Sequence, residues 1–302
     1  MRLFIFLAIF LSVYGSVHLY WYLKFKRAFV LGSFASLMCI LFMVSMLLTP
    51  LLTRYLERHH LEMPARCLAY VGYFWMGYLF LFFASGLLVD GYRLLLAGVA
   101  RLFETGGALQ LSARQAFVIP LLVAAGITCF GFYEARNITI ERVTLQTPKL
   151  TRAAGRLKIA QISDVHLGLI VGAERLQKIV KLIEAEKPDV LVSTGDLVDG
   201  RSNAVSGLAA MLRRIPTPHG KYAVTGNHEF YAGLNRTLQI TRDAGFKILR
   251  GEGVSIPGLI SIAGVDDPTG RRMGSLPPVS ERTLRSALPR DQFAVLLKHQ
   301  PR

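Results

Sequence analysis

The sequence predicts an α-helical membrane domain with four transmembrane helices, followed by an α/β domain. Two observations carry this prediction. Four long apolar runs lie within residues 1–137, and short apolar segments alternate with helical patterns over residues 138–302. The composition agrees, because 52% of the 302 residues are hydrophobic, only 18% are charged and the mean hydropathy is +0.39. These values exclude a disordered chain and are unusual for a soluble enzyme.

The four apolar runs of the first domain are each about as long as a membrane-spanning helix requires, roughly 20 residues. We expect these helices over Leu3–Leu23, Ala28–Leu52, Cys67–Val89 and Gln115–Tyr133. The first run is too long for the apolar core of a signal peptide, and three more spans follow it. Leu94–Phe103 is shorter and lies among arginines, so we interpret it as an interfacial segment or a connector.

The formal net charge is +15, and the excess is spread over both domains without a Lys/Arg block of the nucleic-acid-binding type. We therefore expect a lipid bilayer, and not a nucleic acid, as a partner. With the N-terminus inside, eight basic residues near the spans face the cytoplasm and six face the other side. This weak bias favours both termini, and with them the α/β domain, in the cytoplasm. We expect the membrane to be the cell (inner) membrane. All three cysteines fall in apolar stretches, so the second domain has no disulfide framework.

Strand-like and helical segments alternate in the second domain, which predicts a sheet covered by helices. Ile138–Leu145 alternates apolar and polar residues as a strand does, and a polar linker over Thr147–Gly155 follows. Further strands are predicted at Leu157–Ile162, Val190–Val192, Tyr222–Thr225, Ile260–Val265 and Phe293–Leu297. Apolar residues at helical spacing predict helices over Gly172–Glu186, Ala204–Ile215 and Asn235–Ala244.

Polar residues follow the ends of these predicted strands, which is where ligands bind in open α/β sheets. The segments are Ser163-Asp164-Val165-His166, Gly195-Asp196-Leu197-Val198-Asp199, Gly226-Asn227-His228-Glu229 and Lys298-His299-Gln300-Pro301. Asp, His and Asn side chains are ligands for Mn, Fe or Zn. Another strand ends in Asp266-Asp267-Pro268, whose two aspartates we interpret as turn formers ahead of the proline.

These motifs resemble the calcineurin-like metallophosphoesterase family, in the branch that carries N-terminal transmembrane helices. The resemblance covers about residues 140–302. It implies a β-sandwich flanked by helices that holds two divalent metal ions, either Mn, Fe or Zn. The resemblance also implies metal ligands on both ions, with one shared carboxylate. Asp164 and His166 would bind the first metal, Asp196 would bridge both, and Asn227 and His299 would bind the second.

The same resemblance implies a catalytic role for His228, which would face the phosphate and stabilise charge or protonate the leaving oxygen. Asp199 either orients a neighbouring side chain or caps the following turn. Glu229 is interpreted as a structural residue or a support for the ligands. The family ends its site with a Gly-His-x-His segment, which these 302 residues do not contain. We therefore expect a C-terminally incomplete domain and a nearly inactive 302-residue form.

The function implied by the resemblance is a membrane-anchored, metal-dependent phosphoesterase that hydrolyses a phosphomonoester or phosphodiester with a two-metal hydroxide mechanism. The alternative is a truncated or degenerate membrane protein that binds phosphate or a protein partner without catalysis. A transporter is disfavoured, because the apolar runs carry almost no charged residues. A lipid-linked substrate is one candidate, motivated by the membrane helices and by the basic residues Arg136, Arg142, Lys149, Arg152, Arg156 and Lys158.

Overall fold

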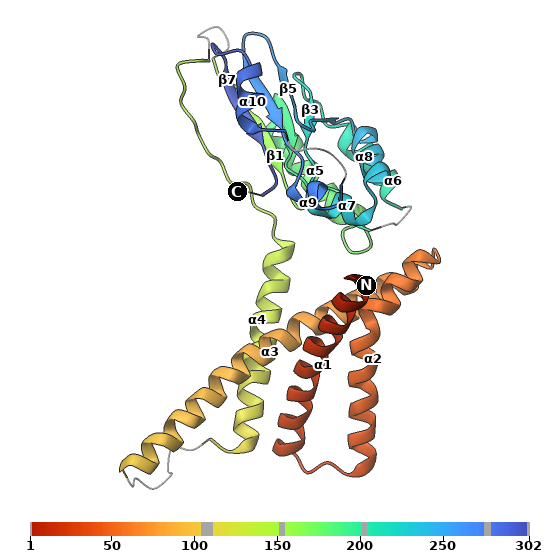
Figure 1. Ribbon diagram of the computed structural model, residues 1–302, viewed down its shortest axis with the longest axis vertical. Helices are drawn as coiled ribbons and strands as arrows, with labels where there is room; N and C mark the ends of the chain where they lie inside the picture. The colour runs from red at the N-terminus through yellow and green to blue at the C-terminus, as the bar shows by residue number, and fades with distance from the viewer. Residues whose placement is uncertain (1, 104–110, 151–154, 201–203, 275–278, 301–302) are drawn as a thin grey trace. The chain divides into compact units, whose positions relative to one another are not determined.

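The computed structural model describes residues 2–103, 111–150, 155–200, 204–274 and 279–300. The chain divides into two compact units, Met1–Ile138 and Thr139–Arg302, which are drawn in Figure 1. Arg152 of the basic linker and Pro301 of the last strand-end motif lie outside the described residues. Each unit is described separately below.

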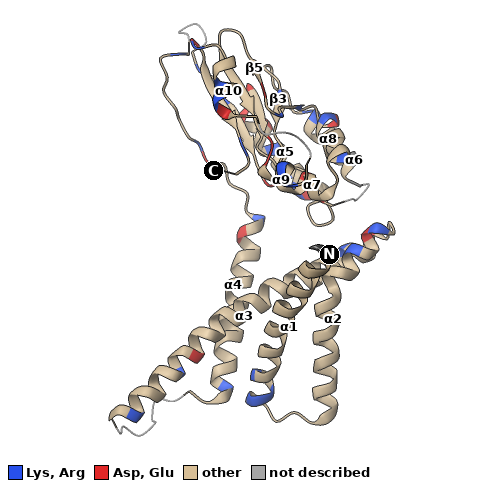
Figure 2. Cartoon of the chain, viewed as in Figure 1, with Lys and Arg blue, Asp and Glu red and all other residues tan. Residues whose placement is uncertain are grey.

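The first unit consists of four long helices, α1 (Arg2–Ala28), α2 (Ser33–Arg58), α3 (Glu62–Phe103) and α4 (Ala113–Arg136). All four are long and apolar enough to cross a membrane, which confirms the helical part of the predicted fold class. The helices alternate in direction, so the start of α1 and the end of α4 lie at the same end of this unit (Figure 1). Figure 2 shows its basic residues gathered toward the two ends of the helices.

Helix α3 is 42 residues long and does not end near Val89, where the third apolar run ends. It continues through Leu94–Phe103, so the segment interpreted as interfacial or as a connector is the last part of α3. At 1.5 Å per residue α3 is about 63 Å long, whereas the hydrocarbon core of a bilayer is about 30 Å thick. Figure 1 shows α3 running obliquely past α1 and α4, so it extends less far along the direction of α4 than its own length.

A polar cluster connects three helices of the first unit. The Lys24 ammonium of α1 donates to Asp90 Oδ1 of α3 at 2.8 Å and to the Ala116 carbonyl of α4 at 3.1 Å. The Tyr20 hydroxyl donates to the other oxygen of Asp90 at 2.7 Å. Around these contacts lies an apolar core that contains the buried ring of Phe82. The paired charges therefore satisfy each other where water is scarce.

The described residues of the second unit form two β-sheets. Strands β1 (Ile159–Ile162), β2 (Val190–Ser193), β3 (Lys221–Ala223) and β4 (Lys247–Ile248) form a parallel sheet in that order. The second sheet is formed by β5 (Glu252–Ser255), β6 (Ile260–Gly264) and β7 (Phe293–Leu297). In it, β5 is antiparallel to β6 and β7 is parallel to β6.

The alternating side chains of β2 show how the layers are stacked, since successive residues of a strand point to opposite faces. Val190 and Val192 pack with Ile260, Ile262 and other residues of the second sheet. Leu191 packs into the other core with residues of the helices that cover the first sheet. The two sheets thus form a sandwich, as the resemblance implies, with helices on its outer face.

Six helices accompany the sheets in the described part of this unit. They are α5 (Ala173–Glu186), α6 (Ala204–Arg213), α7 (Asn227–Ala232), α8 (Leu234–Asp243), α9 (Pro268–Arg272) and α10 (Glu281–Ala287). The strand predicted over Ile138–Leu145 is wrong, because that segment is not part of either described sheet. Arg142 of this segment instead forms an ion pair with Glu186. Glu186 also forms an ion pair with Lys158 at 3.2 Å.

Candidate metal centre

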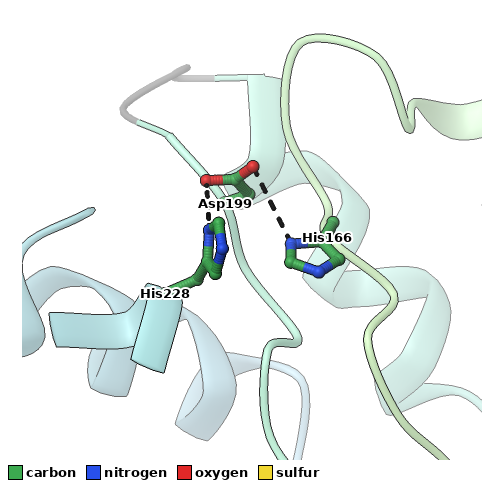
Figure 3. Close-up of side chains that lie close together, drawn as sticks. All are labelled: His166, Asp199 and His228. Carbon is green, nitrogen blue, oxygen red and sulfur yellow. Dashed lines mark hydrogen bonds and ion pairs between the residues drawn. The ribbon is translucent and has the colours of Figure 1, made fainter. Parts of the chain in front are cut away.

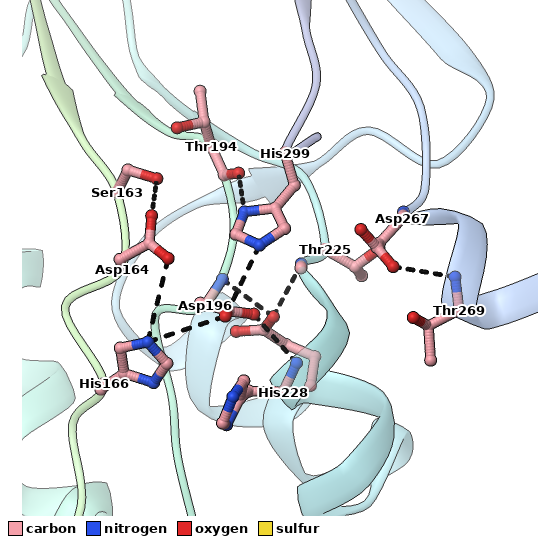
Figure 4. A network of polar contacts seen from close by, with 12 residues as sticks. Ser163, Asp164, His166, Thr194, Asp196, Thr225, His228, Asp267, Thr269 and His299 are labelled. Carbon is pink, nitrogen blue, oxygen red and sulfur yellow. Dashed lines mark hydrogen bonds and ion pairs between the residues drawn. The ribbon is translucent and has the colours of Figure 1, made fainter. Parts of the chain in front are cut away.

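Three neighbouring parallel strands end at one edge of the first sheet and deliver most of the predicted site residues there. Asp164 and His166 follow β1, and Asp196 and Asp199 follow β2. His228 lies in the first turn of α7, which begins four residues after β3 ends. Because the strands are parallel, their carboxyl ends meet at the same edge, and these side chains are brought together (Figure 4).

The second sheet contributes His299, two residues after the end of β7. One ring nitrogen, Nδ1, lies 3.0 Å from the Thr194 carbonyl oxygen, and the other, Nε2, lies 3.5 Å from Asp196 Oδ2. If Nδ1 carries the proton and donates to that carbonyl, Nε2 presents its lone pair toward Asp196. The sandwich therefore places an imidazole from one sheet against a carboxylate from the other.

Asp196 occupies the centre of the arrangement and is only 3% exposed. Its Oδ2 atom lies 3.7 Å from His166 Nε2 and 3.5 Å from His299 Nε2. Its Oδ1 atom accepts a hydrogen bond of 2.9 Å from the His228 backbone N–H. A buried carboxylate with an imidazole nitrogen on each side is the arrangement expected of a shared metal ligand.

The other carboxylates lie on the open side. Asp164 Oδ1 is 3.9 Å from His166 Nε2, and the Asp164 side chain is 57% exposed. The Ser163 hydroxyl donates to the second oxygen of Asp164 at 2.5 Å. Asp164, His166 and Asp196 form a group whose ligand atoms lie within 4.8 Å of one another. Their donor chemistry and spacing fit a divalent cation.

A second group with the same spacing contains His166, Asp199 and His228 (Figure 3). Asp199 lies between the two rings, with one oxygen 3.1 Å from His228 Nδ1 and the other 3.8 Å from His166 Nδ1. The two imidazole rings are 4.5 Å apart in an edge-to-face contact. Asp199 therefore does contact a neighbouring imidazole, and the same geometry makes His228 available as a ligand as well as an acid.

Strained backbone accompanies these residues. Asp164, His166 and Asp196 all have positive φ angles, of 53°, 51° and 52°, which is uncommon for residues other than glycine. Backbone hydrogen bonds hold them there, since the Asp164 N–H donates to the Gly195 carbonyl at 3.1 Å and the His166 N–H to the Asp196 carbonyl at 2.9 Å. Such strain persists only where the surrounding structure fixes it, and it is typical of functional sites.

Two glycines allow the loops after β2 and β3 to approach each other. A Cβ atom on Gly226 would overlap Asp196 Oδ1, and one on Gly195 would lie 2.8 Å from His299 Nδ1. Gly195 also has a φ of 107°, a conformation that disfavours other residues. The glycine before each of these two motifs is therefore required for close packing around Asp196.

Glu229 holds the loops around Asp196 in place through hydrogen bonds to their backbone. It is 3% exposed, and its carboxylate accepts backbone hydrogen bonds from Asp196 at 3.0 Å, Leu197 at 2.8 Å, Val198 at 3.2 Å and Gly226 at 2.7 Å. Burial raises the pKa of this carboxyl, while the backbone donors oppose the shift. One side chain thus fixes both the β2 and β3 loops, in keeping with the supporting role expected for it.

Asn227, the remaining predicted ligand, is the first residue of α7 and is half-buried. The sequence did not indicate the part played by the Thr194 carbonyl, because any residue type supplies that oxygen. Nor did it indicate Tyr231, an exposed residue whose ring lies 5.8 Å from that of His228. The only available signal for Tyr231 was its position three residues after His228, which shares a helical face.

Comparison with known proteins gives the class of this site. The model of a family described as calcineurin-like phosphoesterase matches residues 157–301. An uncharacterized metallophosphoesterase of Aquifex aeolicus is 40% identical over 182 residues, which cover 60% of this chain and 69% of that protein. The chain therefore belongs to the calcineurin-like metallophosphoesterase family, as its strand-end motifs indicated.

Other relatives extend the likeness to membrane proteins. A transmembrane protein with metallophosphoesterase domain from Danio rerio is 29% identical over 170 residues, or 54% of this chain and 39% of that protein. An uncharacterized metallophosphoesterase of Campylobacter jejuni is 29% identical over 199 residues, or 64% of this chain and 51% of its own length. The matched segments thus span about half of the Campylobacter protein and about two fifths of the Danio rerio protein.

Proposed function

We propose that this chain is a membrane-anchored, metal-dependent phosphoesterase that hydrolyses a phosphomonoester or a phosphodiester. The observation that supports it best is the position of Asp196, whose Oδ2 atom lies 3.7 Å from His166 Nε2 and 3.5 Å from His299 Nε2. In this proposal Asp164 and His166 hold one divalent cation, Asn227 and His299 hold a second, and Asp196 contacts both. When bound, two such cations would supply a hydroxide nucleophile and would neutralise the charge that develops on the phosphoryl oxygens.

His228 acts on the substrate in this proposal. One carboxylate oxygen of Asp199 lies 3.1 Å from its Nδ1, and that contact fixes the orientation of the ring. The side chain is 34% exposed, so a phosphate ester at the open side can reach it. His228 then stabilises charge on the phosphoryl oxygens or donates its Nε2 proton to the leaving oxygen.

A lipid-linked ester is the substrate that we favour, with the domain on the cytoplasmic side of the cell (inner) membrane. The helical unit supports it, because an anchored enzyme meets substrates in or near the bilayer. The basic linker gives less support than its sequence suggests. Arg142 and Lys158 both pair with Glu186, and Lys149 donates to the Arg290 carbonyl at 2.8 Å.

The direct test is hydrolysis by the full chain in detergent micelles. We expect slow turnover of an aryl phosphomonoester or phosphodiester with Mn²⁺, loss of turnover with a chelator, and recovery when Mn²⁺ is returned. Turnover that ignores the chelator would contradict the metal mechanism. Metal binding without turnover of any ester would favour the alternative, a non-catalytic phosphate-binding or partner-binding protein.

A further inference from the structure

The Asp266-Asp267 turn contacts the loop between β3 and α7, and Asn227 is the first residue of α7. Thr225 stands two residues before Asn227 and is 1% exposed. Its hydroxyl donates to Asp266 Oδ1 at 2.8 Å and accepts from the Asp267 backbone N–H at 3.2 Å. Figure 4 shows Thr225 between Asp196 and Asp267. Both hydrogen-bonding functions of a buried hydroxyl are thus used to join the end of β3 to the turn after β6.

Asp266 is itself held rigidly by Arg250, which lies between β4 and β5. The Arg250 Nε atom lies 2.9 Å from Asp266 Oδ1, and a terminal nitrogen lies 2.9 Å from Oδ2. The two side chains are only 21% and 17% exposed. A two-pronged guanidinium contact of this kind fixes the plane of the carboxylate as well as its distance. Arg250 therefore fixes the orientation in which the Asp266 carboxylate accepts the hydrogen bond from Thr225.

The same turn also leads into α9, which packs against α7. Asp267 accepts from the Thr269 N–H at 2.8 Å and so caps the start of α9. Helix α9 packs closely on α7, because a Cβ atom on Gly270 would come within 2.6 Å of the Phe230 ring. The residues that follow β6 therefore contact α7 and the loop that precedes it.

We propose that Arg250, Asp266 and Thr225 are positioning residues for the metal ligand Asn227, and this inference rests on the proposed function. Asn227 supplies a neutral amide oxygen, the weakest donor in the proposed set, so its contribution depends on accurate placement. The hydrogen-bonded chain of Arg250, Asp266 and Thr225 provides that placement through Gly226, the one residue between Thr225 and Asn227. This assigns a role to the Asp266-Asp267-Pro268 motif, which turn formation alone does not account for.

The test is Mn²⁺ binding by the full chain in detergent, measured by calorimetry and by the electron paramagnetic resonance signal of bound Mn²⁺. In Thr225→Val the shape is kept and the hydroxyl is lost. We expect one of two Mn²⁺ equivalents to bind about 10–100-fold more weakly, the usual effect of removing a support behind a ligand. Thr225→Ser keeps the hydroxyl and should bind both equivalents as the wild type does. Arg250→Lys should weaken the same equivalent as Thr225→Val.

Thr241→Val is the matched control, because Thr241 is 4% exposed and its hydroxyl donates to the Thr237 carbonyl within α8. Thermal unfolding without metal is recorded for every variant. Equal Mn²⁺ binding by Thr225→Val and wild type would overturn the inference, and so would an equal loss in Thr241→Val or in Thr225→Ser. Absence of Mn²⁺ binding by the wild type would instead overturn the proposed function. If Thr225→Val does not fold, wild-type affinities in Arg250→Lys overturn the inference.

Discussion

Asp196 is the residue on which the proposed centre depends most, because it is buried and its carboxylate lies beside both His166 and His299. We expect Asp196→Asn to lose bound metal and to lower turnover by more than about 100-fold, since loss of a direct ligand should exceed the effect of losing a supporting group. Elemental analysis and aryl phosphate hydrolysis measure the two effects. Asp243→Asn, at an exposed position of α8, is the matched control.

His228 has two roles open to it, and metal content distinguishes them. If it is an acid toward the substrate, His228→Ala keeps its metal and loses about 10²–10⁴ in turnover, the usual contribution of general acid–base catalysis. If the group of His166, Asp199 and His228 holds an ion, the same variant loses metal. We expect the first result, and a fall in bound metal by elemental analysis would show that His228 is a ligand.

At the scale of elements, the Lys24–Asp90 pair joins α1 to α3, with the two side chains 10% and 33% exposed. We expect Lys24→Met to destabilise the helical unit by about 1–3 kcal/mol, less than for a fully buried pair, because the Asp90 side chain is partly exposed. Asp90→Leu added to Lys24→Met removes both charges and should recover much of the loss. Unfolding of the full chain in mixed micelles measures both, and a double variant weaker than the single one would contradict the assignment.

Long, strongly patterned elements could be predicted from the sequence. The four apolar helices and the strands β1, β2, β3, β6 and β7 all lie close to where the residue pattern placed them. Helix α7 was missed because its six residues are too few to show helical periodicity. Ile138–Leu145 failed in the opposite way, since an alternating pattern makes a strand only where another strand pairs with it.

The candidate site also contains residues that could be predicted from the sequence and residues that could not. The residue types and their order after the strands indicated Asp164, His166 and Asp196, and the structure does bring them together. The hydrogen bonds of Thr225 with Asp266 and Asp267 could not be predicted, because they join positions 41 and 42 residues apart through a packing of sheets that periodicity does not specify. Supporting residues of this kind depend on tertiary structure, whereas ligands are recognisable from their local motifs.

For the whole molecule, the distribution of basic residues predicts an orientation in the membrane. The charge bias predicts that residues following α4 face the cytoplasm and that the connection between α1 and α2 faces the other side. A single cysteine placed at Arg142 or at Lys26, in a variant without the three native cysteines, tests this. We expect an impermeant maleimide to label position 26 in intact cells and position 142 only in inverted vesicles. The reverse pattern would place the phosphoesterase domain outside.

The Lys24–Asp90 contact also has a consequence for biogenesis. The two residues are 66 positions apart, so at 5–20 residues per second the ribosome makes Asp90 roughly 3–13 s after Lys24. During that interval the Lys24 ammonium has no counter-charge, and because it lies near the end of α1 it can extend to the head-group region until α3 is made. A nascent chain interrupted between these helices would therefore leave the Lys24 ammonium unpaired and α1 without its contact to α3.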